Sequence, residues 1–208
     1  PTAWYKLNAT NTYAGLNPNF HNALEFVASE SDYIDFGDIT DLDGSAALTL
    51  STWVKPTASG TSSADGIIAK DGATRGFYLA TFTGDKFRFL ISTNGSTNDS
   101  FNSSLAYTTN EWYHLAATWD GSNIKLYING SLDTTQPVSN ATGTLSDNSN
   151  PLRIGNNGGS GYLNGVISNT AIYNQVISAE DIKYLYNGGT PQTNISFEPT
   201  SWYKLDNL

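Results

Sequence analysis

The chain contains no cysteine, and it has only ten lysine and arginine residues against nineteen aspartate and glutamate residues. The absence of cysteine excludes disulfide frameworks and thiol chemistry. Nucleic-acid binding is not expected, because it needs clustered basic side chains, and here they are scattered in a chain of net charge −9. No apolar run approaches the length that spans a bilayer, so membrane insertion is not expected either.

What the chain does have is typical of strands joined by polar turns. Aromatic residues make up 12% of the 208 residues, charged residues only 14%, and there are 19 glycines. A chain of this length can bury the core of one large domain. The composition therefore predicts an all-β domain rather than a helical one.

Short segments of alternating apolar and polar residues predict the strands. In the clearest one, Leu48, Leu50 and Val54 fall on one face and Trp53 on the other, and Pro56 ends the segment. The other predicted strands are 23–27, 33–36, 76–82, 86–92, 112–119, 123–129, 152–155 and 162–173. The stretches 57–65, 93–104 and 133–150 are rich in Ser, Thr, Asn and Gly, and we expect them to be loops.

One short helix is predicted near the C-terminus. Ser178 is a suitable N-cap, and acidic residues follow it in the first turn. Ile182 and Leu185 then share a face, and Asn187-Gly188 ends the helix.

The order of these segments resembles the laminin-G-like jelly-roll domain of the concanavalin A-like lectin/glucanase superfamily. The longest matching block runs from Trp112 to Gly130, and further matches lie between Ala23 and Asn187. The resemblance implies a two-sheet antiparallel β-sandwich, a jelly roll, with one short C-terminal helix. Within it we expect Trp53, Trp112 and Trp119 to provide core or inter-sheet packing rather than platforms for sugar stacking.

A seven-residue motif occurs at both ends of the chain. Thr2–Asn8 and Thr200–Asp206 share five identical residues at an offset of 198. We interpret residues 1–189 as the β-sandwich and 190–208 as a linker followed by the start of a second tandem copy. The alternative is that both motifs are equivalent edge strands of one domain. Since Pro1 is not a translation start, we also expect residues to precede it in the natural protein.

Enzymatic activity is not predicted. Polysaccharide hydrolases that belong to this superfamily carry paired carboxylates in a Glu-x-Asp-x-x-Glu pattern, and none of the five glutamates here completes it. The nearest segment, Glu30-Ser31-Asp32, lacks the third acid. His114 lies within a predicted strand, and we expect it to be structural rather than catalytic.

Calcium is the one cofactor that the resemblance suggests. Many relatives bind one Ca²⁺ ion through carboxylates and backbone carbonyls. The segment Gly165-Val166-Ile167-Ser168 places Ser168 where relatives often have an aspartate ligand, which puts that site in doubt, whereas Asp32 keeps a carboxylate. Asp32 and Ser168 are therefore the candidate metal ligands.

Ligand contact is expected at loops on one edge of the sandwich or on a concave sheet face. The candidates combine planar hydrogen-bonding groups with aromatic rings, as sugar recognition requires: Asp71, Arg75, Asn94, Asp99, Phe101, Tyr107, Asn156, Asn157 and Tyr162.

Three functions compete on the sequence. The first is a non-enzymatic carbohydrate-binding or adhesion module of a repetitive extracellular, cell-surface or virion-surface protein, with glycans, surface proteins and neighbouring copies as partners. The second is a structural module of a fibre, surface layer or virion, assembled as a homo-oligomer through protein–protein contacts. The third, a polysaccharide-active enzyme, has the weakest support.

Overall fold

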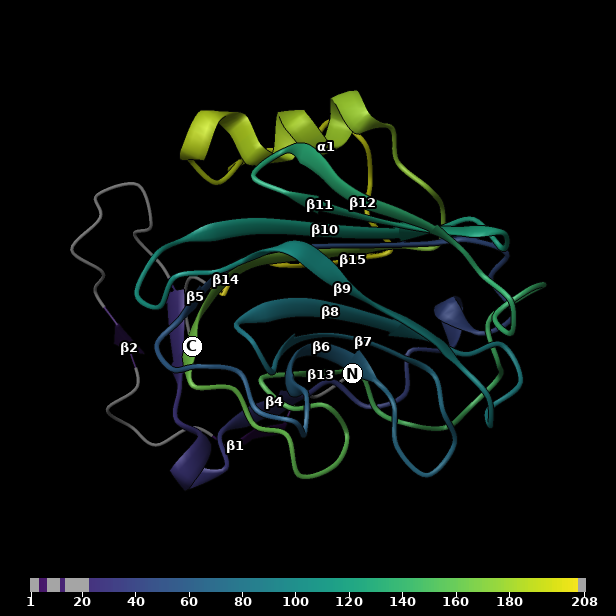
Figure 1. Cartoon of the computed structure of the whole chain (residues 1–208), viewed down its shortest axis with the longest axis horizontal. Helices are drawn as coiled ribbons and strands as arrows, with labels where there is room; N and C mark the ends of the chain where they lie inside the picture. The colour runs from purple at the N-terminus through teal and green to yellow at the C-terminus, as the bar shows by residue number, and fades with distance from the viewer. Residues whose placement is uncertain (1–3, 7–11, 14–22, 206–208) are drawn as a thin grey trace.

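The computed structural model describes residues 4–6, 12–13 and 23–205, and two antiparallel sheets stack face to face in it (Figure 1). The seven-stranded sheet runs in the spatial order β1 (Trp4–Lys6), β4 (Tyr33–Asp35), β13 (Arg153–Ile154), β6 (Asp65–Lys70), β7 (Phe77–Phe82), β8 (Lys86–Ile91) and β9 (Asp99–Ala106). The eight-stranded sheet runs β12 (Ser131–Pro137), β11 (Asn123–Ile128), β10 (Tyr113–Trp119), β5 (Leu48–Pro56), β14 (Gly165–Tyr173), β3 (Ala23–Phe26) and β2 (Thr12–Tyr13), with β15 (Ser201–Tyr203) also paired to β14. The predicted β-sandwich is confirmed.

One helix and three short 3₁₀ turns complete the described structure. The helix α1 (Ala179–Tyr186) lies on the outer face of the eight-stranded sheet (Figure 1). The 3₁₀ turns are η1 (Ala28–Glu30), η2 (Thr40–Leu42) and η3 (Asn187–Gly189). In the described part of the chain, no helix has both the length and the apolar character that membrane crossing requires.

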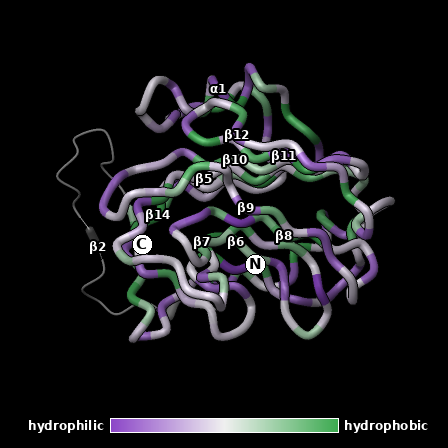
Figure 2. The backbone as a smooth tube through the Cα atoms, viewed as in Figure 1, coloured by the Kyte–Doolittle hydropathy of each residue, from purple (hydrophilic) through white to green (hydrophobic). Residues whose placement is uncertain are grey.

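The main core fills the space between the two sheets. Leu48, Leu50 and Val54 of β5 point into it, as the alternation predicts, and belong to the same buried cluster as Phe87 of β8. Trp119 is fully buried there, and its indole N–H donates a 2.9 Å hydrogen bond to the carbonyl oxygen of Ala141. Strand residues of the interior are apolar while the connecting loops are polar (Figure 2). Burial of this apolar surface is the main force that holds the sheets together.

Trp53 is buried, but not between the sheets. It lies on the outer face of β5, where Tyr186 stacks on it at 5.7 Å between ring centroids and His114 lies 5.3 Å away. The helix explains this second buried layer, because Ile182 and Leu185 of α1 pack on the same face of the sheet. Trp112 is half-buried, with the ammonium group of Lys55 5.7 Å from its ring centre.

The helix begins where the sequence predicts. The Ser178 hydroxyl accepts a hydrogen bond from the Asp181 N–H, and the Asp181 carboxylate accepts one from the Ser178 N–H in return. This reciprocal cap satisfies backbone donors that the first turn leaves unpaired. Asn187 ends the helix in a left-handed conformation.

The prediction of loops at 93–104 and 133–150 was wrong in part, because β9 and β12 extend into these stretches. Both are the last strands of their sheets among the described residues, so one backbone edge of each has no strand beside it; half of the β9 side chains and most of those of β12 are exposed. Such strands need little apolar alternation, which explains why their sequences are polar. The carboxylate of Asp133 in β12 accepts hydrogen bonds from the N–H groups of Ser104 and Leu105 in β9, and this links the two strands.

The two copies of the end motif occupy different places. The β1 segment pairs with β4 in the seven-stranded sheet, whereas β15 pairs with β14 in the eight-stranded sheet. Of the motif residues, Thr2, Ala3, Leu7, Asn8 and Asp206 lie outside the described residues. Both copies are therefore edge strands, but of opposite sheets, and the tandem copy stays a prediction.

Candidate functional site

A cavity of about 370 Å³ opens on the outer face of the seven-stranded sheet. Three loops and two strands surround it: residues 62–64 before β6, residues 71–75 between β6 and β7, residues 157–160 after β13, and the strands β7 and β8. The opposite face of the sandwich is covered by α1, so this face is the one of the two that is open (Figure 1).

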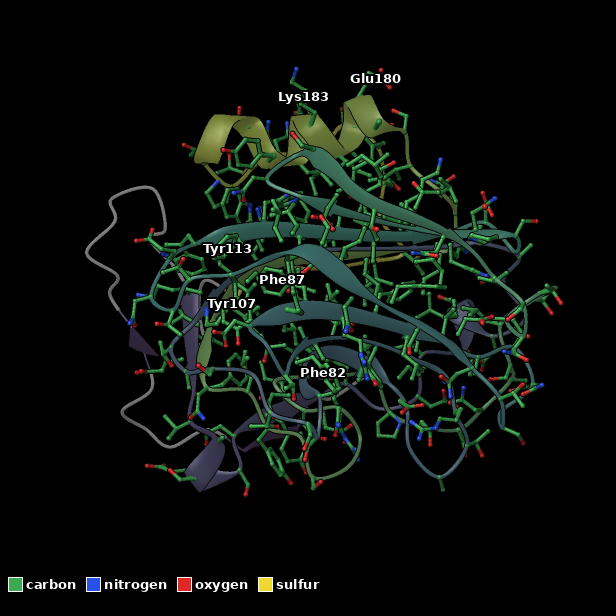
Figure 3. All side chains as sticks on the ribbon, viewed as in Figure 1. Phe82, Phe87, Tyr107, Tyr113, Glu180 and Lys183 are labelled. Atoms are coloured by element: carbon green, nitrogen blue, oxygen red, sulfur yellow. The ribbon has the colours of Figure 1, made fainter. Side chains whose placement is uncertain are left out.

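Alternation along β7 and β8 provides the floor of the cavity. Phe77 and Leu79 of β7 point into the main core, while Tyr78 and Phe82 point outward. In β8, Phe87 points inward and the next residue, Arg88, points outward. Figure 3 shows Phe87 between the sheets and Phe82 beyond the seven-stranded sheet. The same two strands therefore build both the core and the site.

Arg88 and Phe82 form a flat shelf. The guanidinium carbon of Arg88 lies 3.3 Å from the centre of the Phe82 ring, which is a close cation–π contact. The Arg88 Nε–H donates a 2.8 Å hydrogen bond to Asn102 Oδ1 on β9. These two contacts fix the plane of the guanidinium group, which also hydrogen-bonds the Tyr78 side chain; its five N–H donors exceed the number of these partners. Burial raises the pKa of Tyr78, although the positive charge and hydrogen bond of Arg88 oppose that rise.

Asp71 and Arg75 form the second charged pair of the cavity. Arg75 Nη1 lies 3.1 Å from Asp71 Oδ2; the Asp71 side chain is almost fully buried, whereas that of Arg75 is 44% exposed. Burial raises the pKa of Asp71, against the Gly76 N–H and the Arg75 guanidinium, which both favour the charged form. The carboxylate thus orients Arg75 from below and presents the guanidinium group to solvent.

The loop 157–160 forms the rim. Asn157 donates to the Ser63 carbonyl oxygen at 2.7 Å and accepts from the N–H of Gly159 at 2.9 Å, so its amide holds two loops together. Gly158 has a φ of +87°, and a Cβ at this position would collide with the carbonyl oxygen of Asp71. Only glycine allows this close approach of the rim to Asp71.

Three of the predicted ligand residues line this cavity, namely Asp71, Arg75 and Asn157. Two others support its rim. The Asn156 amide donates to the carbonyl oxygens of Gly159 and Gly161, and Tyr162 forms isolated bridges with Asn156 and Gly66 while its ring lies 6.3 Å from that of Tyr33. Asn156 is buried, so its role is to shape the loop.

The remaining four candidates do not line the cavity, because they serve the framework. Asn94 stabilises its own turn by accepting from the N–H groups of Ser96 and Thr97. Phe101 packs against the main core. Tyr107 is buried in that core, and burial raises its pKa to about 12.

Asp99 also has a structural environment. Its carboxylate accepts hydrogen bonds from the N–H groups of Ser139, Asn140 and Ala141. Burial opposes the charge, but these donors outweigh it and hold the pKa of Asp99 below its usual value. The carboxylate thus anchors the start of β9 to the loop that follows β12.

The two candidate calcium ligands lie on different elements. Asp32 follows η1 and accepts from the Val27 N–H at 3.0 Å, whereas Ser168 lies within β14 opposite Trp53 of β5. Among the described residues, no group of three or more His, Asp or Glu side chains gathers as a metal site would require. Calcium binding therefore stays a prediction, and no cluster of carboxylates among the described residues supports it.

Sequence reasoning missed Tyr78, Phe82 and Arg88, which supply the floor of the cavity. The signal for Arg88 is present in the sequence Phe87-Arg88-Phe89, where a charged residue alternates with core aromatics. In a strand with one face in the core, such a residue must point to the outer face. His114, which we expected to be structural, is fully buried; its Nε2 is 2.9 Å from the Ser51 hydroxyl, and burial lowers its pKa to about 3.

Residues 28–183 match a laminin-G-like domain family described as the concanavalin A-like lectin/glucanases superfamily. The chain belongs to this family. This match confirms the resemblance that the sequence motifs indicate. No curated protein sequence matches the chain at a significant level.

Solved structures of similar fold include receptor-binding parts of bacterial toxins. The receptor-binding domain of botulinum neurotoxin mosaic serotype C/D has a TM-score of 0.68 at 19% identity, over 90% of this chain and 46% of that chain. The binding domain of Paraclostridial Mosquitocidal Protein 1 has a TM-score of 0.68 at 14% identity, over 89% and 47%. A structure of botulinum neurotoxin type C, whose cell entry is described as dependent on interaction with two ganglioside molecules, has a TM-score of 0.64 at 19% identity, over 89% and 46%. The chain thus spans slightly less than half of each of these structures, and at these identities the likeness establishes the fold alone.

Proposed function

We propose that this chain is a non-enzymatic carbohydrate-binding or adhesion module that binds an acidic sugar in the cavity on the seven-stranded sheet. One observation carries the proposal: two of the three arginines of the chain, Arg75 and Arg88, line this one cavity together with the ring of Phe82. The volume of about 370 Å³ is in the range of small-ligand sites and suits one or two sugar rings.

The chemistry of the lining favours a glycan. A sugar ring has an apolar face that packs on an aromatic ring and hydroxyl groups that need planar hydrogen-bonding partners. Here the Arg88 guanidinium, stacked on the Phe82 ring, provides the flat surface, and serine hydroxyls at 62, 63 and 160 offer hydrogen bonds around it. The neighbouring toxin that interacts with gangliosides shares this fold, which supports a glycan ligand by analogy only.

The charge of the lining favours an acidic sugar over a neutral one. Asp71 is the one acidic residue among those that line the cavity, and it pairs with Arg75, so the positive charge of Arg88 is left in excess. This contrasts with the net charge of −9 for the whole chain. An arginine guanidinium binds carboxylate or sulfate groups through two parallel hydrogen bonds, which a neutral hydroxyl cannot match.

The same lining argues against hydrolysis. Glycosidases need two carboxyl groups on either side of the scissile bond, and the cavity offers only that of Asp71. Since glycans of this kind are displayed on cells and in extracellular matrices, the proposal also places the module outside the cell or on a virion surface.

The proposal is tested by titrating the protein with glucuronic acid and with glucose, followed by NMR chemical shifts at low salt and in 0.5 M NaCl. We expect glucuronic acid to bind more tightly, with salt weakening it. The Arg88→Gln variant should lose roughly tenfold or more in affinity, because a charge-assisted hydrogen bond contributes about 1.5–3 kcal/mol. Arg153→Gln, which removes an arginine outside the cavity, is the matched control. Equal binding by both sugars, or equal loss in both variants, would contradict the proposal.

The same titration, repeated with calcium and with EDTA, tests whether calcium contributes to binding. Asp32 is the carboxylate that we propose as a ligand, with Ser168 as its predicted partner. If calcium contributes, EDTA will lower the affinity for glucuronic acid and Asp32→Asn will remove that dependence. Identical affinities with EDTA and with calcium would show that the cavity binds without the ion.

A structural role in a fibre, surface layer or virion is the second candidate, and the repeated end motif favours it. Tandem copies present the same surface many times, which suits assembly through contacts between neighbours. Mass photometry of the natural protein distinguishes the two: a monodisperse monomer that still binds glucuronic acid favours adhesion, and defined oligomers without sugar binding favour assembly.

A further inference from the structure

The outer edge of β14 is shared by two strands. Its first half, Gly165–Ile167, pairs with β3, and its second half, Thr170–Ile172, pairs with β15. Between them Asn169 adopts a left-handed conformation with a φ of 51°. The strand β15 therefore pairs with a short, separate stretch of the β14 edge, Thr170–Ile172.

Asn169 contacts the C-terminal segment through both its backbone and its side chain. Its N–H donates to the Lys204 carbonyl oxygen at 3.2 Å, and its Oδ1 accepts from the Trp202 indole N–H at 2.6 Å. The ammonium group of Lys204 lies 4.4 Å above the Trp202 ring. Among apolar side chains, tryptophan is the one that has an N–H to donate to Asn169.

Tyr203, the last residue of β15, and Leu205 beyond it lie on the inner face of the sheet. The Tyr203 ring lies 4.0 Å from that of Phe36, which directly follows β4, and both Tyr203 and Leu205 pack against the main core. The Thr200 hydroxyl accepts a hydrogen bond from the Asn174 N–H at 3.0 Å. Side chains of the motif, and not its backbone alone, therefore hold it at the β14 edge.

Each residue of the C-terminal motif that makes these contacts has an identical counterpart in the N-terminal motif. The five identities between the motifs are the residues that make the contacts: Thr200 and Thr2, Trp202 and Trp4, Tyr203 and Tyr5, Lys204 and Lys6, Leu205 and Leu7. In this structure the N-terminal copy pairs instead with β4. Phe36, which contacts Tyr203, directly follows Asp35, the partner of Trp4 in the β1–β4 pairing.

We propose that the β14 edge is a docking site for this motif as such, and that the Thr2–Leu7 segment docks there when the C-terminal copy is removed. The two ends of the chain then compete for one place. In a tandem array, the first strand of each following copy would complete the sheet of the copy before it, and the junction would be a strand rather than a free linker.

A stability cycle tests the competition. Trp202→Ala/Tyr203→Ala removes the C-terminal copy, Trp4→Ala/Tyr5→Ala removes the N-terminal copy, and a fourfold variant removes both. If the two motifs replace one another, the fourfold variant will lower the unfolding midpoint by more than the sum of the two pairs. Additive losses would mean that each motif has its own place, and would overturn the proposal.

A disulfide trap tests the docking directly and does not need the fourfold variant to fold. The chain has no cysteine of its own. Ser201 lies opposite Ile172, so by the offset of 198 a docked Ala3 would take the same position. In the Trp202→Ala/Tyr203→Ala background, Ala3→Cys with Ile172→Cys should cross-link on oxidation, as mass spectrometry of the digest would reveal. Ser201→Cys with Ile172→Cys in the native background is the positive control; cross-linking there but not with Ala3→Cys would refute the docking.

Discussion

The two outer faces of the sandwich are built from similar alternating strands, yet they differ in what covers them. The outer face of the eight-stranded sheet carries Trp53, His114 and Tyr173 and lies beneath α1. The outer face of the seven-stranded sheet carries Tyr78, Phe82 and Arg88 and borders an open cavity. An aromatic residue that points away from the main core thus lies beneath a helix on one side and borders a cavity on the other. The covering element, and not the residue type, makes the difference.

The largest expected effect comes from emptying the covered face. Trp53→Ala should lower the free energy of unfolding by about 3–5 kcal/mol, because it leaves a large void beneath Tyr186 and α1. Chemical denaturation followed by fluorescence measures the change. Sugar binding at the other face should survive in the folded fraction. Leu132→Ala, at a side chain that is 55% exposed, is the control and should change the free energy by no more than about 0.5 kcal/mol.

The next effect should fall on the open face alone. Gly158→Ala forces the rim away from Asp71, because the residue has positive φ and its Cβ would collide with the Asp71 carbonyl oxygen. We expect a loss of about 1–2 kcal/mol in stability and a clear loss of sugar affinity. Gly143→Ala is the matched control, since this glycine also has a positive φ, of +97°, but lies outside the cavity lining, and a Cβ there would meet nothing within 4 Å. Calorimetry of both variants decides: equal sugar binding would show that the rim does not shape the site.

The covered face should also be the pH-sensitive one. Burial lowers the pKa of His114 to about 3 in the folded chain, from 6.5 in the unfolded chain. The neutral ring is therefore favourable to folding above pH 6.5, and stability falls as the pH drops from 6.5 toward 3. The slope approaches ~1.4 kcal/mol per pH unit, the value for one proton. Denaturant titrations between pH 7.5 and 5 should show this slope in the native chain and not in His114→Gln; a flat native profile would mean that the ring accepts a proton in place.

The smallest expected effect is at the end of the covering helix. Ser178→Ala removes the hydroxyl that accepts from the Asp181 N–H, which should cost about 1 kcal/mol. Thermal unfolding measures this, with Ser131→Ala at an exposed serine as control. Unchanged stability would indicate that packing of Ile182 and Leu185, and not the cap, holds α1 in place.

The sequence predicted most of the fold, because strands such as β5 and β10 alternate between the core and one outer face. It failed for β9 and β12, whose edge positions relieve them of that pattern. Of the residues that line the candidate cavity, the sequence singled out Asp71, Arg75 and Asn157, which lie in polar loops, and not the strand residues that form the floor.

These residues were missed for a physical reason. In β7 both faces are apolar, so Phe82 cannot be distinguished from a core residue by sequence alone. Conversely, Asp99 and Tyr107 are residue types found in sugar sites. Here the Asp99 carboxylate accepts hydrogen bonds from backbone N–H groups, and the Tyr107 ring is buried in the main core. Which partner satisfies a side chain depends on distant segments, and that is what the structure adds.

Asp133 has a consequence for how densely such molecules can be displayed. Exposed strand edges are templates on which identical chains add to one another. By occupying N–H groups at the border of β9, this single carboxylate removes donors that an incoming strand would need. At high local concentration this would limit strand-to-strand association of neighbouring molecules along the β9 edge. We expect Asp133→Asn to aggregate at a lower protein concentration than the native chain.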